Sequence, residues 1–160
     1  MISEFRVEKT KAEAVITLSD GVSVRGRFFV VASTANDWGP ERIKDLLNAE
    51  PGFFPFEVGD LGHSRTVLFN RRHVVMVTLA GHDEPSRDPG YEDATTKSVN
   101  VLLSNGTRVT GVVKLYLPQG RDRLSDYART GEAFRYLEAP GKTFIVNLRH
   151  VVELSETPAT

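Results

Sequence analysis

The chain has 160 residues, of which 40% are hydrophobic and 26% are charged, and its 20 basic and 21 acidic side chains nearly cancel. This composition is typical of a globular chain rather than a disordered one, and the length fits one domain or two very small ones. The absence of cysteine excludes disulfides, Fe–S clusters, cysteine-ligated zinc and cysteine nucleophiles. A near-neutral charge also argues against DNA and membrane surfaces as partners.

The first predicted element is a β-hairpin. Alternating apolar positions in 14–18 and 22–30 flank Asp20-Gly21, a pair that favours a type I′ turn because both turn residues adopt positive φ. Gly26 lies inside the outgoing strand, where a glycine is typical of a bend or of a close backbone approach. We therefore expect a strongly curved hairpin.

A short helix and two strands follow the hairpin. Pro40 suits the first turn of a helix over 41–48, whose apolar residues form one stripe. Two apolar segments, 66–69 and 73–79, predict strands joined by a polar turn that begins at Asn70. The next stretch, 81–96, is acidic, has two prolines and has few apolar residues, so we expect an exposed linker there.

The second half of the chain repeats this pattern. Five hairpin residues, Leu18, Ser19, Gly21, Val24 and Gly26, recur as Leu103, Ser104, Gly106, Val109 and Gly111. The polar turn recurs 77 positions later, and a helix is predicted at 122–129. We interpret 10–80 and 97–156 as two copies of one unit. The predicted fold is β-rich α+β, with two tandem barrel-like or curved antiparallel-sheet units, each with one short helix, related by approximate twofold pseudo-symmetry.

The polar turns hold the candidate binding residues, which are Asn70, Arg71, Arg72, His73, Asn147, Arg149 and His150. One interpretation is turn architecture, in which asparagine adopts a left-handed conformation and histidine caps the turn. The other is a pair of loops that bind a phosphate or carboxylate, because arginine offers a bidentate donor fork.

Two further sets have both a structural and a binding interpretation. Arg42 and Asp45, like Arg123 and Asp126, are three residues apart on the predicted helices and favour ion pairs; the alternative is a partner-binding helix surface. The aromatic residues at 53–56 and 134–136 predict core packing, with an aromatic binding face as the alternative. Within this set Phe54 is the residue most free to face outward, because arginine replaces it in the second copy.

Nothing in the sequence indicates a catalytic or metal centre. The histidines lack the spacing of a closed metal site, and the common nucleotide-binding and hydrolase motifs are absent. We predict a protein that is not an enzyme and has no cofactor or metal; a metal-dependent enzyme is the remote alternative. The longest apolar run, 28–32, is too short to span a bilayer, and the first residues lack the apolar segment of a signal peptide, so we expect a cytoplasmic location.

Each unit resembles the Sm-like family of small bent-sheet barrels. The first signature of that family is similar to Ile16-x-Leu18-x-Asp20-Gly21-x-x-Val24-x-Gly26, and the second to residues 67–77. The resemblance implies a curved sheet, a tendency to form rings or pseudo-dimers, and RNA as a ligand. Our leading hypothesis is a non-catalytic binding or adaptor module that engages another protein through its sheet edges or helix surface, as a pseudo-dimeric monomer or small oligomer. The alternative is an Sm-like RNA-binding protein that uses the polar turns.

Overall fold

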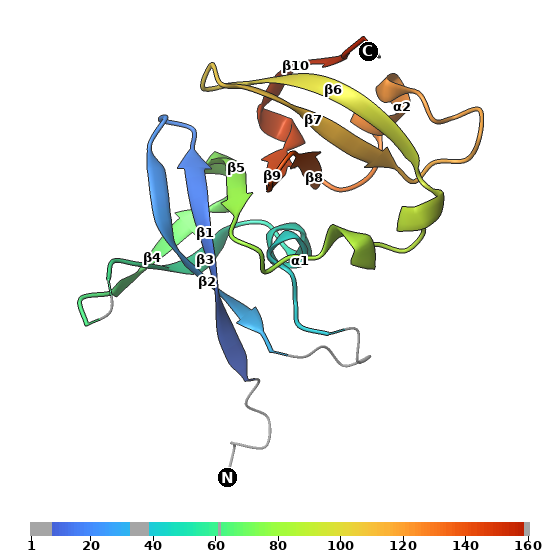
Figure 1. The fold of residues 1–160 in the computed structure, drawn as a ribbon. Helices are drawn as coiled ribbons and strands as arrows, with labels where there is room; N and C mark the ends of the chain where they lie inside the picture. The colour runs from blue at the N-terminus through green and yellow to red at the C-terminus, as the bar shows by residue number, and fades with distance from the viewer. Residues whose placement is uncertain (1–7, 33–38, 61, 159–160) are drawn as a thin grey trace.

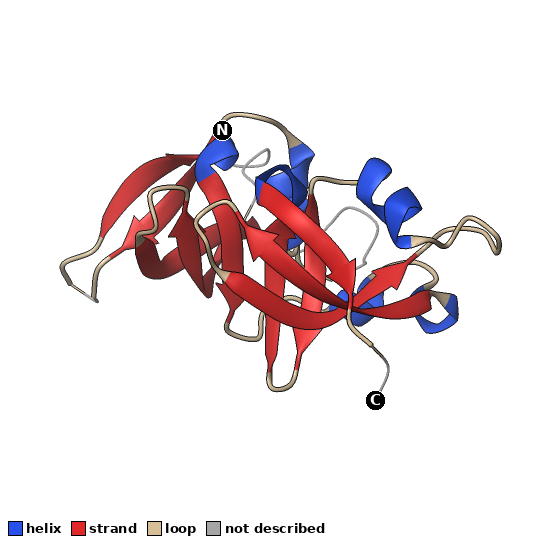
Figure 2. Cartoon of the chain, turned by 90° about the horizontal axis from the view of Figure 1, so that it is seen from above, coloured by secondary structure: helices blue, strands red, loops and turns tan. Residues whose placement is uncertain are grey.

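The structure is a computed structural model that describes residues 8–32, 39–60 and 62–158. Within these ranges ten strands form one antiparallel sheet in the order β10-β6-β7-β8-β9-β5-β1-β2-β3-β4. Two α-helices accompany the sheet, and α1 lies between the two halves, where it contacts β8 (Figures 1 and 2). The predicted β-rich α+β class is confirmed at this level.

The elements follow the same order in both halves of the chain. The first half consists of β1 (Lys9–Leu18), β2 (Ser23–Val31), α1 (Ile43–Ala49), β3 (Phe53–Val58), β4 (Arg65–Asn70), the 3-10 turn η2 (Arg71–His73) and β5 (Val74–Leu79). The second half consists of β6 (Thr95–Leu103), β7 (Arg108–Leu115), α2 (Leu124–Arg129), β8 (Phe134–Ala139), β9 (Lys142–Asn147), the 3-10 turn η5 (Leu148–His150) and β10 (Val151–Glu156).

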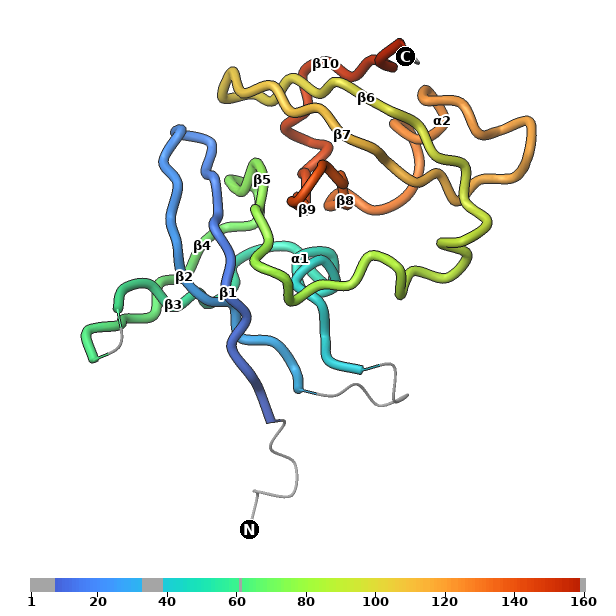
Figure 3. Tube along the Cα trace, viewed as in Figure 1, coloured from blue at the N-terminus to red at the C-terminus, as the bar shows by residue number. Residues whose placement is uncertain are grey.

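The described strands form an open sheet, and the predicted barrel closure is not observed. The last strand of each half pairs with the first, β5 with β1 and β10 with β6. Closure of the first half would need β4 to pair with β5, but β4 is one end of the sheet in the described ranges. Instead β5 lies beside β9 of the other half (Figure 3). This pairing places Val77 opposite Ile145.

The glycine inside each second hairpin strand marks a close approach, as its position predicts. A Cβ atom at Gly26 would lie 2.1 Å from the backbone oxygen of Glu57, and one at Gly111 would lie 2.4 Å from Cδ2 of Leu137. No side chain fits at either position, so these glycines allow the third strand of each half to cross close to the second.

The apolar residues form two clusters, and each cluster contains side chains from both halves of the chain. The first cluster, built mainly on β1 to β5, also contains Phe134, Tyr136 and Ile145 from β8 and β9. The second, built on β6 to β10, also contains Val75 and Met76 from β5. The cores therefore interlock, because β5 and β9 each send side chains into both.

The aromatic residues of β3 pack in the core, with one correction to the predicted orientation. Phe54 is only 1% exposed and stacks on Phe28 with ring centroids 5.3 Å apart, whereas Phe53 is 61% exposed. The prediction that Phe54 is the residue of this set most free to face outward is wrong. Alternation along the strand puts Phe54 and Phe56 on the buried face together, and leaves Phe53 on the opposite face.

Among the described residues, the ion pairs predicted on the helices form in the first half only. Arg42 and Asp45 pair at 3.0 Å. Burial alone would raise the pKa of Asp45, but the hydrogen bonds and charge of Arg42 outweigh it, so the pKa is lowered. In α2 the side chain of Asp126 pairs with Arg129 at 3.2 Å, and Arg123 contributes its backbone N–H instead. Asp126 therefore still caps the helix, but it pairs with a cation further along it.

The connection between the halves carries two 3-10 turns, η3 (Pro85–Arg87) and η4 (Tyr91–Asp93). It differs from the exposed linker that its composition predicts, because Asp83 is only 8% exposed and bonds to α1. None of the described helices is long and apolar enough to cross a membrane.

Candidate functional site

The asparagine of each polar turn caps the 3-10 turn that follows it. The side-chain oxygen of Asn70 accepts the N–H of Arg72 at 3.0 Å, and that of Asn147 accepts the N–H of Arg149 at 3.0 Å. Asn70 has φ −85° and Asn147 also has φ −85°, so the predicted left-handed conformation is wrong. These asparagines are used for their side-chain acceptors, which satisfy a free N–H at the start of the turn.

The two histidines hold the polar turns against the hairpin turns. Nδ1 of His73 lies 2.9 Å from Oγ of Ser19, and Nδ1 of His150 lies 2.8 Å from Oγ of Ser104. The backbone carbonyls of the same histidines accept the N–H groups of the same serines. This double contact explains why serine and histidine recur together in the sequence, and it assigns the histidines a structural role.

Arg71 is buried and fixes the start of β3 to the middle of α1. Its guanidinium donates to the carbonyl oxygens of Phe53 and Leu46 at 2.9 and 3.0 Å, and stands over the ring of Phe54. Burial lowers the pKa of Arg71, and no carboxylate forms an ion pair with it in the described ranges. Its Nε is buried without a hydrogen-bond partner.

The fold brings the two polar turns together. Nε2 of His150 lies 2.5 Å from the carbonyl oxygen of Arg72, and the side-chain amide of Asn147 donates to the carbonyl of Val74 at 2.9 Å. Both contacts span more than 70 residues of sequence and follow directly from the pairing of β5 with β9.

A cavity of about 410 Å³ opens at this junction. It is bordered by the end of α1, the loop after it, and both turns, and we call it the junction cavity. Four of the seven candidate residues line it: Arg71, Arg72, Asn147 and Arg149. Asn70, His73 and His150 do not; they serve the turns. The cavity also has two glutamates, Glu50 and Glu132, on its wall, so its formal charge is one positive.

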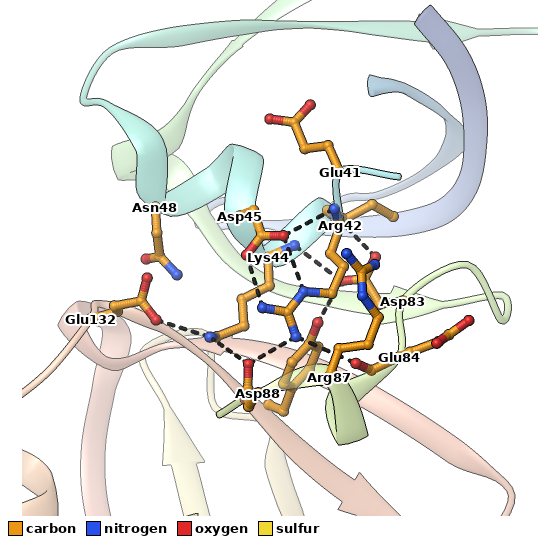
Figure 4. Close-up of polar contacts among 12 residues, drawn as sticks. Glu41, Arg42, Lys44, Asp45, Asn48, Asp83, Glu84, Arg87, Asp88 and Glu132 are labelled. Carbon is orange, nitrogen blue, oxygen red and sulfur yellow. Dashed lines mark hydrogen bonds and ion pairs between the residues drawn. The ribbon is translucent and has the colours of Figure 1, made fainter. Parts of the chain in front are cut away.

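A charged network beside α1 was not anticipated from the sequence (Figure 4). The carboxylate of Asp83 accepts the N–H groups of Ile43 and Lys44 at 2.7 and 3.0 Å, and the hydroxyl of Tyr136 donates to it at 3.0 Å. Burial raises the pKa of Asp83. The only sequence signal for this network was the acidity of the connection, which lies about 40 positions after the basic residues Arg42 and Lys44.

The rest of this network joins α1 to the second half. The guanidinium of Arg42 donates to Asp88 at 2.8 Å, while Nζ of Lys44 pairs with Glu132 at 2.9 Å and with Asp88 at 3.6 Å. These groups satisfy one another, and the network therefore serves to position the halves. No group of histidine and acidic residues that could hold a metal occurs among the described residues.

The two ends of the sheet form a second candidate surface. Neither β4 nor β10 has an outer neighbour in the described ranges, and both are six residues long. Leu68 on β4 is 63% exposed and Val152 on β10 is 67% exposed. Apolar edge strands with unpaired backbone groups are templates for pairing with another strand.

Comparison of the chain with family models, with curated proteins and with solved structures found no match. The interpretation of these sites therefore rests on their geometry.

The contrast between the two neighbouring arginines gives a stability prediction. Arg71→Leu removes the donors to the carbonyls of α1 and β3, so we expect the free energy of unfolding to fall by on the order of 3 kcal/mol. Arg72→Leu changes an exposed side chain, and we expect it to stay within about 0.5 kcal/mol of wild type. Urea denaturation measures both; equal effects of the two substitutions would contradict the structural role of Arg71.

Proposed function

We propose that the chain is a tandem duplication of one β-rich unit that acts as a non-catalytic protein-binding module, pairing through its open sheet edges with further copies of itself. One observation carries the proposal. The chain joins its own halves by pairing β5 with β9, while the equivalent strands at the ends of the sheet, β10 and β4, lack outer partners in the described residues.

The duplication is supported by matched details in the two halves. Both have the order of two strands, a helix, two strands, a 3-10 turn and a strand. The asparagine cap, the serine–histidine contact and the crowded strand glycine occur in both. Side-chain bonds repeated at equivalent positions favour duplication over a chance resemblance of two short strand patterns.

The offset between the copies sets the register of the proposed contact. Positions in β4 and β5 correspond to those 77 residues later in β9 and β10. Within the chain Val77 lies opposite Ile145. The equivalent residues are Leu154 and Leu68, so the proposed contact places Leu154 of one copy opposite Leu68 of the next.

Several properties of the edges support this partner. All four strands concerned, β4, β5, β9 and β10, have six residues, so the free edges match in length. Pairing would satisfy the outer backbone groups and cover the exposed side chain of Leu68. Because the two edges differ, the contact is head-to-tail and leads to a ring or an open chain of copies. The Sm-like resemblance, which implies rings or pseudo-dimers, agrees with this.

The absence of cysteine fits a reducing compartment, and we propose a cytoplasmic location.

Disulfide cross-linking tests the contact directly, because the natural chain has no cysteine. We expect an equimolar mixture of Leu68→Cys and Leu154→Cys proteins to form the mixed dimer on mild oxidation, since residues opposite in an antiparallel pair lie within disulfide range. Non-reducing electrophoresis followed by mass spectrometry identifies the product.

The matched control replaces Leu68→Cys by Val22→Cys, which is 51% exposed at the hairpin turn and away from both edges. The proposal predicts little mixed dimer with this control. Equal yields for the two mixtures, or a wild-type protein that sediments as a monomer up to high micromolar concentration, would overturn it.

RNA binding is a second candidate function, favoured by one specific observation. Arg72 and Arg149, which are 77 residues apart in the sequence, both border the junction cavity. Arginine pairs bidentately with phosphate, and the cavity has a net positive charge. Under this proposal the polar turns of both halves contact one RNA backbone.

A 12-nucleotide single-stranded RNA of random sequence tests this candidate by fluorescence anisotropy. We expect saturable binding that weakens as salt rises, and that falls at least about tenfold in the Arg72→Ala, Arg149→Ala double variant because two phosphate contacts are lost. The control double variant, Arg25→Ala with Arg121→Ala, removes two exposed arginines elsewhere and should bind as wild type does. Absence of binding at low salt, or equal losses in both variants, would rule out this candidate.

A further inference from the structure

A second cavity, of about 250 Å³, lies between the connection and the second half of the chain. Its lining comes from α1, the connection with its turns η3 and η4, the end of β7, α2 and β8. All four tyrosines of the sequence border it: Tyr91, Tyr116, Tyr127 and Tyr136. We call it the tyrosine cavity, and it shares no edge strand with the proposed protein contact.

Hydrogen bonds at the hydroxyl groups fix three of these rings. The hydroxyl of Tyr91 donates to Glu138 at 3.0 Å, that of Tyr116 to Asp88 at 3.2 Å, and that of Tyr136 to Asp83. Burial is the main reason that the pKa of Tyr116 and of Tyr136 is raised, so these hydroxyls stay protonated as donors. The cavity therefore has preformed aromatic walls, against which a flat ring can stack.

Among the described residues, two cations on the cavity wall have no carboxylate partner. Nζ of Lys114 stands 4.4 Å from the ring centre of Tyr91, and the guanidinium carbon of Arg135 stands 4.4 Å from that of Tyr127. Within the described ranges neither forms an ion pair, and Arg135 instead donates to backbone carbonyls. The third cation of the lining, Lys44, is already neutralised by Glu132 and Asp88.

The charge of the ligand is set by Lys114. The lining has three cations and three carboxylates, so its formal charge is zero. Lys44 is held by two carboxylates, Arg135 by backbone carbonyls, and Glu138 accepts the hydroxyl of Tyr91. Among the described residues, Lys114 is the cation of this lining with neither a carboxylate nor a backbone acceptor. A ligand that complements this wall is flat and aromatic, and carries one carboxylate that reaches Nζ of Lys114.

We propose that the tyrosine cavity binds a small aromatic carboxylate, with its ring against the tyrosines and its carboxylate on Lys114. The volume is below that of sites for drug-sized ligands, so one or two fused rings fill it. This site is independent of the edge pairing, and either proposal can fail without the other.

The test uses 2-naphthoate as the probe, with binding measured by isothermal titration calorimetry and by saturation-transfer NMR on the full chain. Two analogues separate the parts of the recognition: 2-naphthylmethylamine keeps the rings and reverses the charge, and cyclohexanecarboxylate keeps the charge and loses the aromatic ring. We expect saturable binding of naphthoate and at least about tenfold weaker binding of both analogues.

The variant Lys114→Gln should weaken naphthoate binding at least about tenfold, whereas Lys142→Gln, which changes an exposed lysine on β9, should leave it unchanged. Thermal unfolding confirms that both variants fold. Absence of saturable naphthoate binding, equal binding by Lys114→Gln, or binding of the amine as tight as that of the acid would each overturn the proposal.

Discussion

Three residue pairs between β5 and β9 join what would otherwise be two separate five-stranded sheets. Alternation along these strands sends Val77 and Ile145 into one core, and Met76 and Val146 into the other. Each core is therefore completed by a strand from the other half. The same pairing brings the two polar turns together and creates the junction cavity, so the candidate sites depend on it.

Polar contacts fix the angle at which the two halves meet. The side-chain amide of Asn48, at the end of α1, donates to the carbonyl of Phe134 and accepts its N–H, as a neighbouring strand would. Asp83 caps α1 and also binds the hydroxyl of Tyr136. A buried carboxylate is costly unless it is satisfied, and here each contact holds it to an element of a different half. The network thus favours one arrangement of the halves and supports the wall of the tyrosine cavity.

Local elements could be predicted from the sequence because their signals are local. Asp20-Gly21 indicated the hairpin turn, Gly26 indicated a close approach, and Pro40 with an apolar stripe indicated α1. The orientation of Phe54 follows from alternation along β3, and the arginine at the matching position of the second half does not indicate it. The conformation of Asn70 was missed because its side-chain acceptor, and not its backbone, is what the turn uses.

The long-range features could not be predicted in the same way. The sequence of a strand does not determine which other strand lies at its edge. The pairing of β5 with β9 could therefore not be predicted from the residues of either strand. The contact of Asp83 with α1 spans 40 residues, and the four tyrosines that border one cavity are spread over 46 positions, from Tyr91 to Tyr136. The repeated Asn-x-Arg-His pattern was the one sequence signal for the junction cavity. The pattern recurs because both polar turns make the same asparagine and histidine hydrogen bonds.

Native-state hydrogen exchange tests most directly whether the pairing of β5 with β9 makes one cooperative unit of the two halves. Under increasing urea, the amides of β5 and β9 should exchange with the same opening free energy as the central amides of β1 and β6, because each core is incomplete without the other half. Exchange of residues 97–156 through a separate, lower-energy opening, with β1 and β5 still protected, would contradict this account.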